Sequence, residues 1–138
     1  MATGSRFNLQ VITPDRTVLS APAYAVVLPG TVGELGVLPG HAPFFSTLKI
    51  GAMRVSSESG GETELLAISG GFVDVRGNEV VVLTPSAERA EEIDVSRAEA
   101  AARRAEERLA ARSADLDFAR AHAALTRALN RLVIAKRK

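Results

Sequence analysis

Apolar residues in the first two-thirds of the chain fall in short runs, several of which alternate with polar residues. In Phe7-Asn8-Leu9-Gln10-Val11 every second side chain is apolar, so a strand formed there buries one face and exposes the other. Similar runs, rich in β-branched residues, predict further strands at 24–28, 50–55, 64–68, 72–75 and 80–83.

Turn-forming pairs lie between these runs or close to their ends. They are Pro14-Asp15, Pro29-Gly30, Pro39-Gly40, Gly60-Gly61, Gly70-Gly71 and Gly77-Asn78. All 11 glycines of the chain lie before residue 78. So many tight turns in a short segment are typical of an antiparallel β-sandwich or barrel.

The composition changes abruptly after Thr84-Pro85 to Ala, Glu and Arg, with neither Gly nor Pro. One helix is predicted over 94–112, with either Asp94 or the Ser96/Glu99 capping box at its start. After a short break at 113–115, a second helix is predicted over 117–136. Because the link is short, the helices form an antiparallel hairpin. We therefore assign 1–88 to the β-sandwich and 89–138 to the hairpin.

The apolar faces of the two predicted helices differ in size. The first helix has a seam of small residues, and the second has larger ones at helical spacing: Ala98, Ala102, Ala105 and Leu109, then Phe118, Leu125, Leu129 and Leu132. Burial of Ala removes much less apolar area than burial of Leu, at ~25 cal/mol per Å². We therefore expect the hairpin to be marginally stable and to detach at modest cost.

Several classes of site lack the residues that they need. The chain has no cysteine, which excludes disulfides, thiolate zinc sites and cysteine nucleophiles. His41 and His122 are too few and too scattered for a zinc site, and no Walker or dinucleotide-binding motif occurs. A cupin-type enzyme would need a metal cluster inside the sandwich, for which no second histidine is available. We expect a protein without catalytic activity.

No stretch approaches the ~18 apolar residues of a membrane span, and the N-terminus has no apolar run behind a basic start. We expect a soluble, unexported protein. Residues 1–92 carry six Lys or Arg and ten Asp or Glu, whereas residues 93–138 carry eleven and six. An acidic body is thus joined to a basic tail.

Four arginines of the tail are predicted to converge on one edge of the hairpin. Arg97 and Arg131 are equally far from the turn, and Arg104 and Arg127 follow them at helical spacing. A polyphosphate would accept several guanidinium donors at once, with Asp94 close by to orient it.

Two other interpretations of the basic tail stay open. One is a solvated face with ion pairs such as Glu99 to Arg103. The other is nucleic-acid binding by the basic end at 136–138, but no aromatic residues accompany that charge, so we expect no nucleic-acid partner.

Several segments together resemble the epsilon subunits of bacterial and chloroplast ATP synthases, and the resemblance covers essentially the whole chain. They are Val11-Ile12-Thr13-Pro14-Asp15-Arg16, Gly33-Glu34-Leu35-Gly36-Val37-Leu38-Pro39-Gly40-His41-Ala42-Pro43, Leu48-Lys49-Ile50-Gly51, Ser69-Gly70-Gly71-Phe72 and Ala87-Glu88-Arg89-Ala90. The resemblance implies a sandwich of about ten strands followed by a two-helix domain. It also implies a peripheral protein on the cytoplasmic side of a bacterial inner membrane.

The resemblance further implies the partners and a regulatory role. The sandwich of that family binds the γ subunit and the c-ring, and Glu34 and His41 match loop positions associated with this rotor contact. Its C-terminal helices either fold against the sandwich or extend to the β subunit and block ATP hydrolysis.

Some members of the family bind ATP at the folded hairpin. The motif that they use is similar to Ile93-Asp94-Val95-Ser96-Arg97-Ala98, and further positions match it: Glu88, Arg104, Arg127 and Arg131. The resemblance thus makes ATP a regulatory ligand rather than a required cofactor. The alternative is a free-standing nucleotide sensor that works without a larger assembly.

Overall fold

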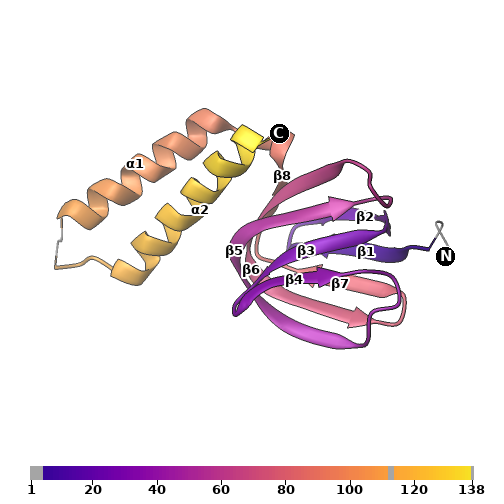
Figure 1. Cartoon of the computed structure of the whole chain (residues 1–138). Coiled ribbons are helices and arrows are strands. Elements are labelled where there is room, and N and C mark those ends of the chain that lie inside the picture. Colours follow the sequence, from indigo (N-terminus) through magenta and orange to yellow (C-terminus); the bar gives the residue numbers. More distant parts are fainter. Residues whose placement is uncertain (1–4, 112–113, 138) are drawn as a thin grey trace.

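The computed structural model describes residues 5–111 and 114–137, which form a β domain and a helical hairpin (Figure 1). The elements are β1 Phe7–Ile12, β2 Thr17–Ala23, β3 Ala25–Gly30, β4 Gly33–Val37, β5 Phe44–Ser56, β6 Thr63–Arg76, β7 Glu79–Leu83, β8 Ala87–Arg89, the 3-10 turn η1 Ala90–Glu92, α1 Val95–Ala111 and α2 Phe118–Arg137. The predicted fold, a β-sandwich followed by two helices, is confirmed. The predicted boundary at 88/89 falls inside β8.

The strands follow the order β2-β1-β7-β6-β5-β3-β4, and β8 pairs with β6. Two long strands, β5 with 13 residues and β6 with 14, run the whole length of the domain. One half of β6 pairs with β8 and the other half pairs with β7. The sheet therefore folds over along β5 and β6, and its two layers enclose the core (Figure 1).

The strand count and one pairing differ from the prediction. Eight strands occur in the described residues instead of about ten, because β5 and β6 are continuous through both layers. The predicted strands at 64–68 and 72–75 are two halves of β6. The sheet is also not wholly antiparallel, since β1 pairs with β7 in parallel. The other edge of β1 is already occupied by β2, to which a short turn connects it.

Gly70-Gly71 is a bend inside β6 rather than a turn between two strands. Both glycines have positive φ, +98° and +109°. A Cβ on Gly71 would lie 1.9 Å from the carbonyl oxygen of Leu83, so only glycine fits there. At this bend β6 leaves β8 and begins to pair with β7.

The sandwich core consists of large aliphatic side chains. The alternation predicted for β1 is confirmed, because Phe7, Leu9 and Val11 are all buried. They belong to one cluster with buried residues of every other strand from β2 to β8. The largest fully buried side chains are Leu9, Leu28, Met53, Leu66 and Ile68.

The hairpin begins where Asp94 caps α1. Oδ1 of Asp94 accepts a hydrogen bond from the backbone N–H of Arg97 at 3.1 Å, and Asp117 caps α2 in the same way through Arg120. The first of the two predicted starts is therefore the one used. The predicted helix end at Arg112 and the Ser113 of the predicted turn lie outside the described residues.

Alanine fills the contact between the helices. The predicted seam of α1 is buried at Ala98, Ala102 and Ala105. The predicted seam of α2 is wrong in part, because Phe118 and Leu129 are 64% and 47% exposed. The buried residues of α2 are instead Ala121, Ala128, Ile134 and Ala135. Small side chains on both helices allow a close approach, which turns the leucines toward one side.

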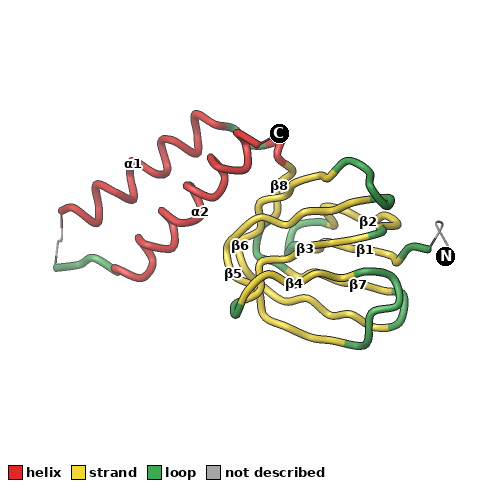
Figure 2. The backbone as a smooth tube through the Cα atoms, viewed as in Figure 1, coloured by secondary structure: helices red, strands yellow, loops and turns green. Residues whose placement is uncertain are grey.

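The hairpin docks on the sandwich through the C-terminal end of α2, and its other end projects away from the sandwich (Figure 2). Ile134 is fully buried in a small apolar cluster with Ala135 of the hairpin and Ala67, Ala90 and Ile93 of the sandwich and linker. In addition, the side-chain amide of Asn130 donates a hydrogen bond of 3.0 Å to the Gly51 carbonyl. The docking contact is thus small compared with the sandwich core.

Candidate ligand-binding cleft at the base of the hairpin

A cleft of about 360 Å³ lies where the hairpin meets the sandwich. Its lining comes from β8, η1, α1 and α2: Glu88, Glu92, Asp94, Arg97, Ala98, Ala101, Arg104 and Arg131. Six of the eight residues predicted for ATP binding are therefore brought together. Three guanidinium groups and three carboxylates face one space, with the two alanines providing an apolar wall.

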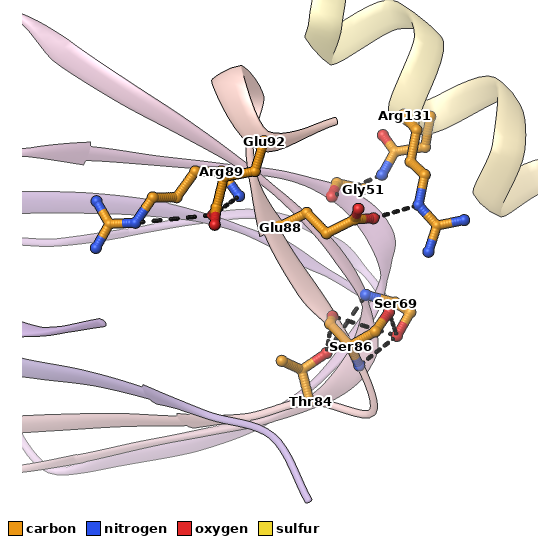
Figure 3. A network of polar contacts seen from close by, with 9 residues as sticks. Gly51, Ser69, Thr84, Ser86, Glu88, Arg89, Glu92 and Arg131 are labelled. Carbon is orange, nitrogen blue, oxygen red and sulfur yellow. Dashed lines mark hydrogen bonds and ion pairs between the residues drawn. The ribbon is translucent and has the colours of Figure 1, made fainter. Parts of the chain in front are cut away.

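Serine and threonine side chains fix the position of β8, and therefore of Glu88. The Thr84 hydroxyl is buried; it accepts from the Ser69 N–H and donates to the Ser86 carbonyl at 3.1 Å. The Ser86 N–H donates to the Ser69 hydroxyl at 2.9 Å. Figure 3 shows this network beneath the Glu88 side chain. These hydrogen bonds thus hold β8, and with it Glu88, against β6.

Glu88 and Arg131 form an ion pair across the cleft, and Figure 3 shows their side chains pointing toward each other. The two side chains are 33% and 31% exposed, so water screens the pair only in part. This pair links β8 to α2. A ligand that engages Arg131 must therefore share it with Glu88 or replace Glu88.

A second acidic residue, Glu92, also lines the cleft, and arginines hold its carboxylate in place. Its Oε1 accepts a hydrogen bond of 3.2 Å from the Arg89 N–H, and its Oε2 lies 3.9 Å from the Arg16 guanidinium. Arg89 is itself anchored by an ion pair with Glu64. The Glu92 carboxylate is thus held by Arg89 and Arg16, while the residue still lines the cleft.

Arg97 and Arg104 face the cleft without an acidic partner. Within the described ranges 5–111 and 114–137, neither guanidinium has a carboxylate oxygen within 4.0 Å. The ion pair Glu99 to Arg103, given above as an example for the solvated-face interpretation, is also not formed among these residues. Unpaired guanidinium groups in a partly enclosed cleft are the donors that phosphate oxygens accept.

The two remaining predicted residues lie outside the cleft. Ile93 is 6% exposed and packs in the docking cluster, where it supports the cleft from below. Arg127 lines a much smaller neighbouring cavity, together with Ser69, Ser86, Asn130 and Arg131. The sequence analysis missed Glu92 and Ala101, although Ala101 lies four residues after Arg97 and so shares its helical face.

The two candidate rotor residues lie at opposite ends of β4. Glu34, next to the β3–β4 turn, is 66% exposed and is 3.7 Å from the Arg54 guanidinium. His41 follows β4, where Nδ1 lies 2.7 Å from the Ala42 carbonyl oxygen and the ring packs edge-on against Phe44. They do not form one compact site.

An exposed apolar groove of about 480 Å³ lies on the other side of the β6 bend, and the sequence analysis did not find it. It is lined by Ile12, Thr13, Pro14, Gly71, Phe72, Leu83, Thr84 and Pro85. Phe72 and Leu83 are 45% and 48% exposed, and Phe45 stacks on Phe72 with ring centroids 5.6 Å apart. Exposed large apolar side chains that gather on one face are typical of a protein interface.

The described part of the chain contains no group of three or more His, Cys, Asp or Glu residues that could hold a metal ion. In the same part, no helix has the length and apolar character needed to cross a membrane.

The comparisons with known proteins assign both domains to one family. The family model for the beta-sandwich domain of the ATP synthase delta/epsilon chain matches residues 6–90, and that for its long alpha-helix domain matches 91–136. The ATP synthase epsilon chain of Pelotomaculum thermopropionicum is 56% identical over 77% of this chain and 78% of its own length. That of Carboxydothermus hydrogenoformans is 52% identical over 78% and 79%.

A solved structure supports the same fold. A chain of the mitochondrial ATP synthase of Euglena gracilis matches with a TM-score of 0.75 at 24% identity, over 100% of this chain and 85% of that chain. At this identity the match bears on the fold alone, whereas the two family models and the curated relatives assign the family. The chain belongs to the epsilon chain family of the F-type ATP synthase.

Proposed function

We propose that the chain is a non-catalytic rotor subunit in the central stalk, whose hairpin restrains ATP hydrolysis and senses ATP. The sandwich is the rigid part that binds the γ subunit and the c-ring. The hairpin is the mobile part that also contacts the β subunit. In this role the protein is peripheral, on the cytoplasmic side of the inner membrane.

The apolar groove is the surface that we assign to the γ subunit. Phe45, Phe72 and Leu83 are large apolar side chains exposed close together, so their burial under a protein partner would be favourable. The c-ring contact then falls to the ends of β4, where Glu34 and His41 lie. Because these ends are separated, we assign them to different parts of the ring surface.

One observation carries the regulatory part of the proposal: the cleft takes its lining from both domains. Glu88 comes from the sandwich, Asp94 caps α1, Arg97 and Arg104 come from α1, and Arg131 comes from α2. A ligand held by all of them binds only while the hairpin is docked. Its binding therefore shifts the equilibrium toward the docked form.

The energies are compatible with such a switch. A ligand present at 100 times its Kd stabilises the docked form by about 2.7 kcal/mol. Among the described residues, the hairpin is held by one small apolar cluster, one amide hydrogen bond and one ion pair whose partners are about one-third exposed. A contribution of that size is comparable to what these contacts supply, so ATP can decide between the two states.

The charge of the tail suits its contact with the β subunit. Residues 93–138 carry eleven basic and six acidic side chains, a net charge of +5, whereas residues 1–92 carry six and ten, a net charge of −4. Opposite charge speeds and orients the encounter with an acidic partner surface. The released hairpin is the basic part of the molecule.

The test is to lock the hairpin in its docked position within the whole ATP synthase. The chain has no cysteine of its own, so cysteines at Ala52 and Asn130 can be joined by a flexible bis-maleimide in the isolated chain before it is assembled with the other subunits. We expect crosslinking to raise the ATPase activity, because the hairpin can no longer reach the β subunit. Crosslinker applied to Ala52→Cys alone is the control. Unchanged activity after complete crosslinking would refute the inhibitory role.

Calorimetric titration of the isolated chain with ATP tests the sensing role. Arg104→Gln is expected to weaken binding about tenfold, through loss of a charge-assisted hydrogen bond. Arg103→Gln, one residue away and outside the cleft, is the matched control and should bind like the parent protein. If ATP binds but the protein is purified from its own membranes without γ or c subunits, the free-standing sensor is the better account.

A further inference from the structure

The arginines of the cleft belong to a longer row that follows one side of the hairpin. On α1, Arg97, Arg104 and Arg108 are spaced by seven and four residues. At 3.6 residues per turn, these positions lie within about 40° of one another around the helix. On α2, Arg120, Arg127 and Arg131 are likewise spaced by seven and four residues. Each helix therefore carries three arginines at positions close to one line, although the Arg127 side chain lines the small neighbouring cavity against the sandwich.

The two lines lie on the same side of the hairpin. Arg97, Arg104 and Arg131 line one cleft, which fixes the direction in which both lines face at the base. Because the helices are antiparallel, Arg108 and Arg120 are the members nearest the tip (Figure 1). From Arg97 to Arg108 the row extends about 16 Å, at ~1.5 Å per residue. The row thus continues well beyond the cleft.

The acidic residues near this row are Glu88, Glu92 and Asp94 at its base and Glu107 beside Arg104 and Arg108, and most of the arginines are not paired with them. Among residues 5–111 and 114–137, only Arg131 of the row forms an ion pair, with Glu88. Glu99 and Glu106 stand roughly 180° from Arg97 around α1, on the opposite edge. Arg97, Arg104, Arg108 and Arg120 are exposed. These four exposed guanidinium groups therefore offer unpaired donors to an anion that carries several charges.

We propose that this side of the hairpin binds a linear phosphate chain longer than a triphosphate, that is, inorganic polyphosphate, with one end of the chain in the cleft. A phosphate chain carries charge on every unit, so it can meet each guanidinium in turn as it follows the row. The forked donors of arginine match phosphate oxygens. The row is one side chain wide on each helix, which suits a thin chain better than a broad acidic protein surface. The inference needs no nucleotide and so does not rest on ATP binding.

The experiment compares binding of inorganic tripolyphosphate and of size-fractionated long-chain polyphosphate to the full chain by calorimetry. We expect the long chain to bind more tightly, and the double variant Arg108→Gln/Arg120→Gln to lose about tenfold of that affinity while its affinity for tripolyphosphate stays unchanged. A long phosphate chain offers more binding positions than tripolyphosphate. This advantage is the same for the parent chain and the double variant, so it cancels when their affinities for the long chain are compared. Arg103→Gln, exposed on α1 but about 120° away from the row, is the matched control and should lose little.

Three results would overturn the inference. They are equal loss of affinity in Arg103→Gln, an unchanged affinity of the double variant for long chains, and equally tight binding of poly-glutamate, which would identify the row as a surface for acidic protein. Circular dichroism verifies that the variants keep their helices. Binding of polyphosphate without binding of ATP would refute the proposed nucleotide sensing and leave this inference standing.

Discussion

The sandwich and the hairpin are built from side chains of very different size. The sandwich core buries Leu9, Leu28, Met53, Leu66 and Ile68 completely. The interface between the helices buries alanines: Ala98, Ala102, Ala105, Ala121 and Ala128. A leucine has three more carbons than an alanine, and each buried methylene contributes about 0.8 kcal/mol. Equal numbers of buried residues therefore stabilise the two domains very unequally.

The difference also shows in where the leucines of the hairpin lie. Leu129 of α2 is 47% exposed and its neighbour Val133 is 51% exposed, although both could fill a core. The close approach of the alanine faces leaves them at the edge. Separating the helices from the sandwich therefore exposes little additional apolar surface, which keeps the cost of release low. A rigid sandwich with a detachable hairpin follows from these residues.

The largest effect is expected from a change that breaks the sandwich at its bend. Gly71→Ala places a Cβ 1.9 Å from the Leu83 carbonyl oxygen, at a φ of +109°. We expect a loss of about 3 kcal/mol or more in the free energy of unfolding. Gly77→Ala is the matched control, because Gly77 also has positive φ, +55°, but no atom lies within 4 Å of its added Cβ.

For Gly77→Ala the expected loss is about 1 kcal/mol. Urea denaturation followed by circular dichroism measures both variants. Similar losses in the two would mean that the close approach at Gly71 is relieved by a small shift of β7, and that the bend is less rigid than we infer.

The second prediction concerns the contact that docks the hairpin on the sandwich. Ile134 is fully buried in the docking cluster, whereas Val133 beside it is half-exposed. Ile134→Ala should weaken docking by about 2 kcal/mol, at the low end of such losses because small residues surround it. Hydrogen exchange should then become faster in the linker and α2 but stay unchanged in β5 and β6.

Val133→Ala is the control for this variant, and its effect should stay within about 0.5 kcal/mol. Faster exchange in the sandwich of Ile134→Ala would contradict the separation of the two domains, since it would mean that they unfold together.

Much of this comparison was predictable from local sequence, and the rest depends on contacts between distant residues. The alternation in β1 and the alanine seam of α1 identified both domains, and the family is confirmed. The predicted turn at Gly70-Gly71 was wrong, because a glycine pair can serve a bend as well as a turn. Only the approach of Leu83, 12 residues away from Gly71, decides between them.

The candidate site shows the same limit. Helical spacing placed Arg97, Arg104 and Arg131 on one edge, and the cleft confirms that they meet. The exclusion of Arg127 depends on how α2 sits on the sandwich, which no local pattern encodes. The apolar groove was missed for a similar reason, because Phe45 and Phe72 meet only through the pairing of β5 with β6.

A smaller effect on stability is expected at the start of α1, the first helix of the hairpin. Asp94→Ala removes the side-chain cap of α1 and should reduce the stability of the hairpin by about 1 kcal/mol. Asp117→Ala removes the equivalent cap of α2 and should cost the same. Because only Asp94 lines the cleft, the first variant should also weaken ATP binding in calorimetry. Equal ATP affinity in the two variants would exclude Asp94 from the binding site.

The smallest change in stability is expected at the ion pair between Glu88 and Arg131, which joins the hairpin to the sandwich across the cleft. Glu88→Gln keeps the size of the side chain and removes the charge that faces Arg131. Since both partners are about one-third exposed, docking should weaken by only about 0.5 kcal/mol, and less at high salt. Phosphate binding should change in the opposite direction, because Arg131 no longer has a competing carboxylate.

Tripolyphosphate should therefore bind Glu88→Gln more tightly than it binds the parent chain. Glu92→Gln is the control, because Glu92 lines the same cleft but its carboxylate pairs with Arg16 and Arg89 instead of Arg131. ATP separates two roles of Glu88: if this carboxylate only competes for Arg131, ATP binding also becomes tighter. If Glu88 accepts a hydrogen bond from the ribose or base, ATP binding weakens while tripolyphosphate binding improves. Weaker binding of both ligands would contradict the predicted gain in affinity, because it would mean that the loss of docking outweighs the gain from a freed guanidinium group.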